Sequence, residues 1–145
     1  MTDDYNIELN KTVVKRLLGE VFNGRNLDLL PEILTSDFVL NPLAAFPPEK
    51  EHGPEGMRRL YEGFFVGIPD VKAETLTMVA EGNTVMVYDR FGGTHDGQLG
   101  PFAPTGKQLF WNVMHLYRIR NGKIAEDNVL VDALGLMRQV GAISD

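Results

Sequence analysis

The sequence has 145 residues, 43% of them hydrophobic and 23% charged, with a formal net charge of −6 at pH 7. This length suits one compact domain with its own hydrophobic core, so residues 1–145 are expected to form a single domain. The negative charge and the lack of clustered lysines or arginines argue against a protein that binds nucleic acids or anionic membranes, and the absence of cysteine excludes disulfides and thiolate chemistry.

The N-terminal part of the chain is predicted to be helical and to lack an export signal. Its first residues are acidic, and no segment reaches the roughly 20 apolar residues that cross a membrane, so a cytoplasmic protein is expected. Apolar residues at helical spacing predict an amphipathic helix over residues 8–23, followed by a short helix over 29–34 and a strand over 37–40. The loop over residues 42–53 combines prolines with apolar residues, Phe46 among them, which favours a cover for a pocket.

The rest of the chain is predicted to form another helix, a series of antiparallel strands and a terminal helix. Pro54 suits the first turn of a helix whose apolar stripe includes Tyr61 and Phe64. Turn signals separate strands predicted over residues 71–80, 84–91, 107–120 and 123–131. A terminal helix begins at Asp132 and ends at Gly141. Helices followed by antiparallel strands indicate an α+β fold, in which a curved antiparallel sheet wraps around the long N-terminal helix.

The strongest turn signal, Asn121-Gly122, predicts a two-residue hairpin turn between the last two strands. Stepping back from that turn sets these residues opposite one another: Arg120 and Lys123, His115 and Asn128, and Trp111 and Asp132. His115, Asn128, Trp111 and Asp132 then share one face of the two strands with apolar side chains. This mixture of polar and apolar groups resembles the lining of a ligand pocket. The opposite face, which includes Asp127 and Val129, is also amphipathic, and a one-residue bulge would exchange the two assignments. The first face is predicted to line the interior.

His115 and Asp132 are the candidate catalytic residues on this face. An imidazole inside a strand can take or give a proton near neutral pH, although a structural histidine bonded to Asn128 fits the same pattern. Asp132 lies at a strand-to-helix junction, where a carboxylate caps the terminal helix or, buried beside Trp111, acquires the raised pKa of a general acid or base. Asn41, which ends its strand, can donate to a substrate carbonyl, but Asn-Pro is also an ordinary turn opener.

No other motif indicates a metal, a phosphate or a nucleophile. His95 lies in a glycine-rich stretch, residues 92–97, that is interpreted as a bend rather than a phosphate loop. His52 lies in the polar part of a loop, and the scattered histidines lack zinc-ligand spacing, so no metal is expected. Asp89 and Arg90 are adjacent and point to opposite faces of a strand, so a surface salt bridge is the default for either.

Short motifs along nearly the whole chain form a recognisable set. They are Phe22-Asn23-Gly24, Asp37-Phe38, Gly53-Pro54-Glu55-Gly56, residues 93–97, Pro104-Thr105-Gly106, residues 122–126 and residues 132–141. In order and spacing they resemble the SnoaL-like polyketide cyclase family. The resemblance implies an NTF2-like cone, a homodimer formed through the sheet, and no metal or organic cofactor. It also implies a small hydrophobic molecule as partner, because the characterised cyclases close an aromatic polyketide ring by an intramolecular aldol step in a largely apolar pocket.

The resemblance extends to some of the site residues. The cyclase histidine on the penultimate strand matches His115, and the asparagine that ends the first strand matches Asn41. The cyclase aspartate, by contrast, falls on Val129. Asp132 or Asp127 could replace the missing carboxylate.

The leading hypothesis is an enzyme that performs cofactor-independent acid–base chemistry on a hydrophobic carbonyl compound. Its predicted acid and base are His115 and Asp132, and its predicted substrate-binding residues are Asn41, Trp111, Asn128, Tyr61 and Phe64. The alternatives are a dehydratase or isomerase on the same fold, and a non-catalytic module for ligand binding or dimerisation. An open cavity around His115 and Asp132 would favour catalysis, whereas a cone filled by side chains would exclude it.

Overall fold

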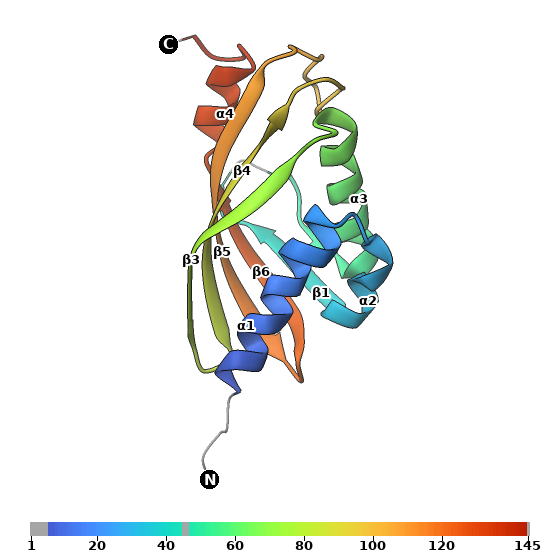
Figure 1. The fold of residues 1–145 in the computed structure, drawn as a ribbon, viewed down its shortest axis with the longest axis vertical. Helices are drawn as coiled ribbons and strands as arrows, with labels where there is room; N and C mark the ends of the chain where they lie inside the picture. Colours follow the sequence, from blue (N-terminus) through green and yellow to red (C-terminus); the bar gives the residue numbers. More distant parts are fainter. Residues whose placement is uncertain (1–5, 45–46, 145) are drawn as a thin grey trace.

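The structure, a computed structural model, describes residues 6–44 and 47–144 and contains a curved sheet that holds helices on its concave side (Figure 1). Its helical segments are α1 (Ile7–Arg16), a π-helical continuation (Leu17–Asn23), a short 3-10 turn (Leu27–Leu29), α2 (Leu30–Ile33), α3 (Gly53–Gly67) and α4 (Ala133–Gln139). Its strands are β1 (Leu34–Pro42), β2 (Glu51–His52), β3 (Lys72–Glu81), β4 (Thr84–Thr94), β5 (Gln108–Arg120) and β6 (Lys123–Val131). The predicted α+β cone is confirmed. Phe46, expected in the pocket cover, lies outside the described residues.

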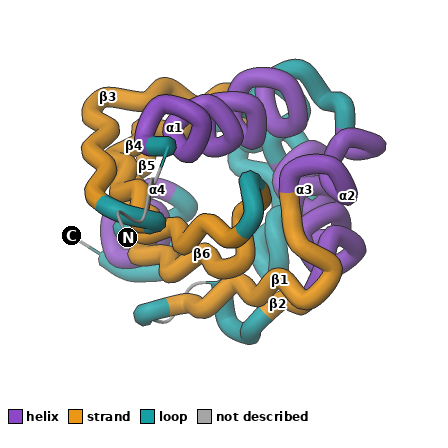
Figure 2. The backbone as a smooth tube through the Cα atoms, turned by 90° about the horizontal axis from the view of Figure 1, so that it is seen from below, coloured by secondary structure: helices purple, strands orange, loops and turns teal. Residues whose placement is uncertain are grey.

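The sheet has the strand order β2-β1-β6-β5-β4-β3. Its pairs are antiparallel except β1 with β6, which is parallel, so the wholly antiparallel sheet expected from the sequence is corrected at this pair. Seen from below in Figure 2, the strands curve around the interior while α1, α2 and α3 close the remaining sides. Within residues 6–44 and 47–144, no helix is long and apolar enough to cross a membrane.

The N-terminal helix is held inside the curved sheet by an apolar stripe and by polar contacts, among them that of Asn10, whose side-chain amide donates to the Gly82 carbonyl at 3.2 Å. The buried apolar residues of the stripe are Val13, Val14, Leu17, Val21 and Phe22. At the end of the helix, the Asn23 side-chain amide donates to the carbonyl of Ala73 at 2.8 Å and accepts from its N–H at 2.9 Å. This pairing satisfies the backbone groups of Ala73 on the open edge of β3, which would otherwise be unpaired at this residue.

A bulge in β6 decides which side chains of this strand face the interior. Next to the turn, Arg120 pairs with Lys123 and Ile119 with Ile124, as predicted, but the register then shifts by one residue at Ala125. As a result, Asn128 lies opposite Leu116 rather than His115, and Asp127 lies opposite Tyr117. The predicted interior face is therefore confirmed for β5 and wrong for β6, because the extra residue reverses the alternation along the remainder of the strand.

The residues of the inner face alternate regularly with exposed ones on both strands. On β5 the buried side chains are Leu109, Trp111, Val113, His115, Tyr117 and Ile119, and beyond the bulge on β6 they are Asp127, Val129 and Val131. In Figure 1 the helices α1 and α3 lie on the concave side of the sheet, and their buried residues belong to the same core cluster as the apolar members of these sets. The core therefore lies between the concave side of the sheet and these helices.

The glycine-rich stretch over residues 92–97, for which a bend is expected, begins as a strand. β4 continues through Gly92 and Gly93 to Thr94, and the chain turns only after it. The Gly97 N–H then donates to the carbonyl of Gly67 at the end of α3, at 3.0 Å. The two segments approach so closely that a Cβ atom on Gly97 would collide with the carbonyl oxygen of Val66. This position therefore requires glycine.

We predict that Gly97→Ala lowers the free energy of unfolding by about 1–3 kcal/mol, the usual cost of forcing atoms into packed space. Gly63→Ala is the matched control, because a Cβ atom there meets nothing within 4 Å. In a helix interior this control exchange should raise the free energy of unfolding by about 0.5–1 kcal/mol. Urea unfolding followed by circular dichroism measures both, and equal stability of the two variants would contradict the close approach.

Candidate functional site

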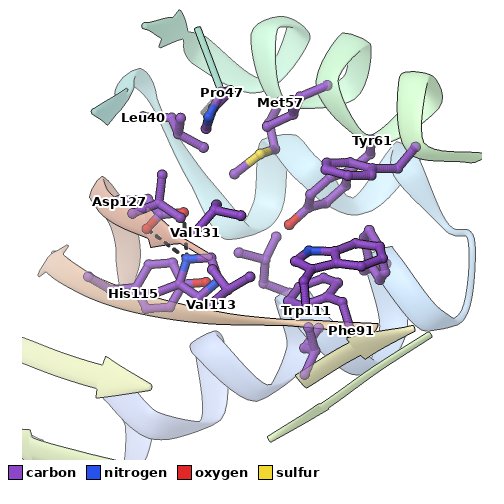
Figure 3. Close-up of a pocket in the computed structure, with 17 residues that line it drawn as sticks. Leu40, Pro47, Met57, Tyr61, Phe91, Trp111, Val113, His115, Asp127 and Val131 are labelled. Atoms are coloured by element: carbon purple, nitrogen blue, oxygen red, sulfur yellow. Dashed lines mark hydrogen bonds and ion pairs between the residues drawn. The ribbon is translucent and has the colours of Figure 1, made fainter. Parts of the chain in front are cut away.

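The cone contains a narrow cavity of about 50 Å³, large enough for a few water molecules (Figure 3). Most of its wall is apolar, formed by Leu17, Leu18, Phe22, Leu40, Pro47, Met57, Leu60, Phe64, Phe91, Trp111, Val113, Val129 and Val131. The polar side chains on the wall are Tyr61, His115, Tyr117 and Asp127. The cavity thus combines an apolar surface with a small set of titratable groups, which is the usual composition of a small-molecule site.

A buried histidine–aspartate pair is the polar centre of the cavity. His115 on β5 and Asp127 on β6 are 9% and 1% exposed. The Nδ1 atom of His115 lies 3.0 Å and 3.1 Å from the two carboxylate oxygens of Asp127. Both residues line the cavity, so a bound molecule can reach the carboxylate and the ring.

A second carboxylate faces the other side of the same ring. Asp89 on β4 is 1% exposed, and its Oδ2 atom lies 3.6 Å from Nε2 of His115, within the range of an ion pair. The Thr75 hydroxyl donates to Oδ1 of Asp89 at 2.8 Å and holds the carboxylate in place. The surface salt bridge expected for Asp89 is therefore wrong, while Arg90 does point outward, with its guanidinium 5.2 Å from the Phe110 ring centre.

The two carboxylates decide the charge of the histidine. Burial lowers the pKa of His115, but the attraction and hydrogen bond of Asp127 and the attraction of Asp89 together outweigh it, so that the pKa is raised above 6.5. Burial also raises the pKa of Asp89, and His115 and Thr75 offset this only in part. Burial, with the nearby charge of Asp127, raises the pKa of the Tyr61 and Tyr117 hydroxyls, which therefore stay protonated and can donate hydrogen bonds.

The predicted aromatic residues lie together at the apolar end of the cavity. The Trp111 ring stacks between Phe64, at 6.0 Å between centres, and Phe91, at 5.7 Å. Tyr61 meets Phe22 edge-on at 4.9 Å, and its hydroxyl points into the cavity in Figure 3. Trp111, Tyr61 and Phe64 are thus placed where substrate-binding residues are needed, although their role stays a prediction.

The other predicted site residues lie outside the cavity. Asn41 and Asn128 pair across β1 and β6, and the side-chain amide of Asn41 donates to the side-chain oxygen Oδ1 of Asn128 at 3.2 Å. Asp132 is exposed and accepts a hydrogen bond from the Gly135 N–H at 2.9 Å, which makes it the N-terminal cap of α4. The expectation that His115, Asn128 and Asp132 share a face is wrong, because the bulge in β6 turns Asn128 away from His115.

Asp127 and Asp89 lie beside His115, where Asn128 and Asp132 are expected from the sequence. Asp127 is one of the two residues that could replace the missing cyclase carboxylate, and the bulge in β6 turns it to the inner face. No local signal identifies Asp89. In the pairing of β4 with β5, Val87 lies opposite His115 and Asp89 lies opposite Val113, so Asp89 shares a face with His115. A long loop joins these two strands, so local sequence does not determine their register.

The remaining histidines do not line the cavity. His52 is exposed at the start of α3. His95 is fully buried; its Nδ1 atom lies 3.0 Å from the Thr105 hydroxyl, and within the described residues its Nε2 atom has no hydrogen-bond partner. Neither histidine therefore contributes to the cluster around His115.

We predict that His115 titrates above pH 6.5 in the folded protein and that Asp127→Asn lowers its pKa, because burial then opposes the charge with only one carboxylate left nearby. Since the pKa is raised on folding, this stabilisation is complete below about pH 6.5 and is lost as the pH rises through the folded-state value. NMR titration of the imidazole nitrogens measures the pKa, with His115→Gln for assignment and exposed Asp132→Asn as control. An unchanged pKa in Asp127→Asn would contradict the pairing.

Comparison with known proteins identifies relatives along nearly the whole chain. The sequence model of the SnoaL-like polyketide cyclase family matches residues 12–140. No protein of curated function matches the sequence significantly. Among solved structures, a protein from Jannaschia sp. CCS1, provisionally named a SnoaL-like polyketide cyclase, is 22% identical with a TM-score of 0.85, over 99% of this chain and 100% of the other.

Two Streptomyces structures are similar in the same way. AclR from Streptomyces galilaeus, provisionally named a hydroxylase, is 21% identical with a TM-score of 0.83, over 97% of this chain and 85% of the other. IdmH from Streptomyces antibioticus, provisionally named a polyketide cyclase, is 24% identical with a TM-score of 0.77, over 91% of this chain and 98% of the other. At these identities the structures establish the shared fold, and the family model covers most of the sequence. The chain therefore belongs to the SnoaL-like polyketide cyclase family.

Proposed function

We propose that this protein is an acid–base enzyme that removes a proton from the carbon next to a carbonyl group in a small hydrophobic molecule. The observation that carries the proposal is the His115–Asp127 pair at the surface of an otherwise apolar cavity. A buried titratable pair in such a place costs folding free energy, and catalysis is a common reason for that cost. Membership of a family named for cyclases supports the same class of chemistry.

The roles within the pair follow from the charges around the ring. With Asp127 at Nδ1 and Asp89 near Nε2, the pKa of His115 is raised, which favours the protonated ring, and a protonated imidazole has no lone pair with which to act as a base. Asp127 is then the base, and His115 is the partner that orients its carboxylate. This assignment replaces Asp132 as the carboxylate of the proposed pair.

The proton transfer can be written with side chains alone. Asp127 takes the proton, and the C–H electron pair forms the enolate, whose oxygen accepts a hydrogen bond from the protonated Tyr61 hydroxyl. In an aldol cyclisation the enolate carbon then attacks a second carbonyl of the same molecule, and the protonated Asp127 returns its proton to the new alkoxide. In an isomerisation, Asp127 returns the proton to another carbon.

We predict that the protein catalyses exchange of α-hydrogens for deuterium in hydrophobic ketones and 1,3-diketones, followed by proton NMR in heavy water. Asp127→Asn should slow the exchange on the order of a hundredfold or more, because the amide cannot take the proton. His115→Gln should also slow it, because Asp127 loses its cationic partner. Asp132→Asn is the matched control, since asparagine caps a helix about as well as aspartate.

Measuring both ketone binding and hydrogen exchange distinguishes an enzyme from a protein that only binds ligands. Ketones that bind the wild-type protein without any exchange above the solvent rate would indicate a binding module instead. Exchange that persists at the wild-type rate in Asp127→Asn would remove Asp127 from the mechanism.

We also propose that two copies of the chain associate through the convex face of the sheet. This face carries exposed apolar side chains, namely Val79, Met86, Phe110, Met114 and Leu130. Several are neighbours across the ladders, since Val79 lies opposite Met86 and Met114 lies opposite Leu130. Apolar patches of this kind favour association because contact removes them from water.

We predict that the wild-type protein is a homodimer in solution and that Met114→Glu converts it to a monomer, because a buried charge at the centre of the patch would lack a partner. Leu9→Glu is the control, as Leu9 is a similarly exposed apolar residue on α1, on the other side of the sheet. Size-exclusion chromatography with light scattering gives both masses. A monomeric wild-type protein or a dimeric Met114→Glu variant would contradict this association.

A further inference from the structure

A second hollow lies outside the cone, between α3 and the segment over residues 98–102. Its volume is about 330 Å³, against about 50 Å³ for the inner cavity. Its walls are mainly apolar and include Leu60, Gly63 and Phe64 from α3 and Leu99 and Phe102 from the facing segment. We refer to this hollow as the outer groove.

Hydrogen bonds and close packing hold the segment that faces α3 across the outer groove. Leu99 and Phe102 exchange backbone hydrogen bonds of 2.9 Å in both directions, and the Gln98 side chain donates to the Gly100 carbonyl at 2.9 Å. Leu99 is buried against Gly67, where even a Cβ atom would come within 2.9 Å of its side chain. A preformed wall of this kind costs little ordering when a ligand binds.

The outer groove and the inner cavity share part of their walls. Pro47, Leu60 and Phe64 line both hollows. Phe64 is also stacked on Trp111, the aromatic residue at the apolar end of the inner cavity. The two spaces are therefore neighbours separated by these shared side chains, and a molecule longer than the inner cavity reaches the outer groove when those side chains turn aside.

We propose that the outer groove binds the apolar tail of an elongated ligand whose carbonyl end lies at His115 and Asp127. At about 50 Å³ the inner cavity is well below the roughly 300–1,000 Å³ of ordinary ligand pockets, so much of the apolar surface of a sizeable ligand must be buried elsewhere. Arg59 and Glu51, which also line the groove, pair at 3.6 Å, so one part of its wall is polar. The ligand class is a slender hydrophobic ketone with an unbranched or flat extension.

This inference rests on the proposed function for the position of the carbonyl, but it is tested by binding alone. The sequence contains a single tryptophan, and Trp111 lines the inner cavity, so its fluorescence reports what binds there. The probes are alkyl phenyl ketones from acetophenone to octanophenone, titrated against the full chain. If the alkyl tail lies in the outer groove, each added methylene should tighten binding about threefold.

Gly63→Leu is the variant that separates the outer groove from the rest of the site. A Cβ atom at Gly63 meets nothing within 4 Å, and Gly63 lines the groove, so a leucine there starts in open space, favours the helix and extends into the groove. Binding of octanophenone should weaken on the order of a hundredfold, toward that of acetophenone. Gly19→Leu is the matched control, since Gly19 is equally open and does not line the groove. Phe102→Ser, which removes an apolar wall, should weaken the long ketones more than the short ones.

The outcomes distinguish this proposal from the proposed function. An unchanged gain per methylene in Gly63→Leu, long ketones that leave the Trp111 emission unaltered, or no ketone binding to the wild-type protein each overturn the outer groove as a ligand subsite. Length-dependent binding that Gly63→Leu abolishes supports it. If such binding occurs without hydrogen exchange, the acid–base function fails while the subsite stands.

Discussion

Buried charge inside an apolar cone is the constraint on which this structure depends. His115, Asp89 and Asp127 are removed from water, and the cone can hold them because each carboxylate faces one nitrogen of the same ring. Loss of one partner would leave an uncompensated charge, a change that costs about 3–5 kcal/mol in comparable buried pairs. The same mutual pairing that makes the cluster tolerable also raises the pKa of the ring, which is the reason for proposing Asp127 rather than His115 as the base.

The bulge at Ala125 connects this cluster to the outside of the protein. One extra residue in β6 turns Asp127 inward and at the same time turns Asn128 and Leu130 outward. Asn128 can then bond to Asn41, and Leu130 joins Met114 on the convex face. A single irregularity thus determines both the chemistry of the cavity and the composition of the surface proposed for dimerisation.

Asp127 lies one inward-facing position before Val129, the residue at which the resemblance to the cyclases implies an aspartate. Side chains two residues apart on a strand point to the same face, so a carboxylate at either position reaches the interior. The sheet supplies the scaffold and the side chains supply the chemistry, so one cone can hold different sets of site residues.

The amino-acid sequence by itself determined the fold class, the main helices, most strands and the inward face of β5, because these follow from local periodicity, turn residues and family motifs. It also singled out His115, Trp111, Tyr61 and Phe64. Only the tertiary structure decided which carboxylates meet the histidine. Strand alternation is lost at a bulge, and the β4–β5 register is set across a long loop, so neither Asp127 nor Asp89 could be placed beside His115 from local patterns. The bulge also moved Asn128 and Asp132 out of the predicted site.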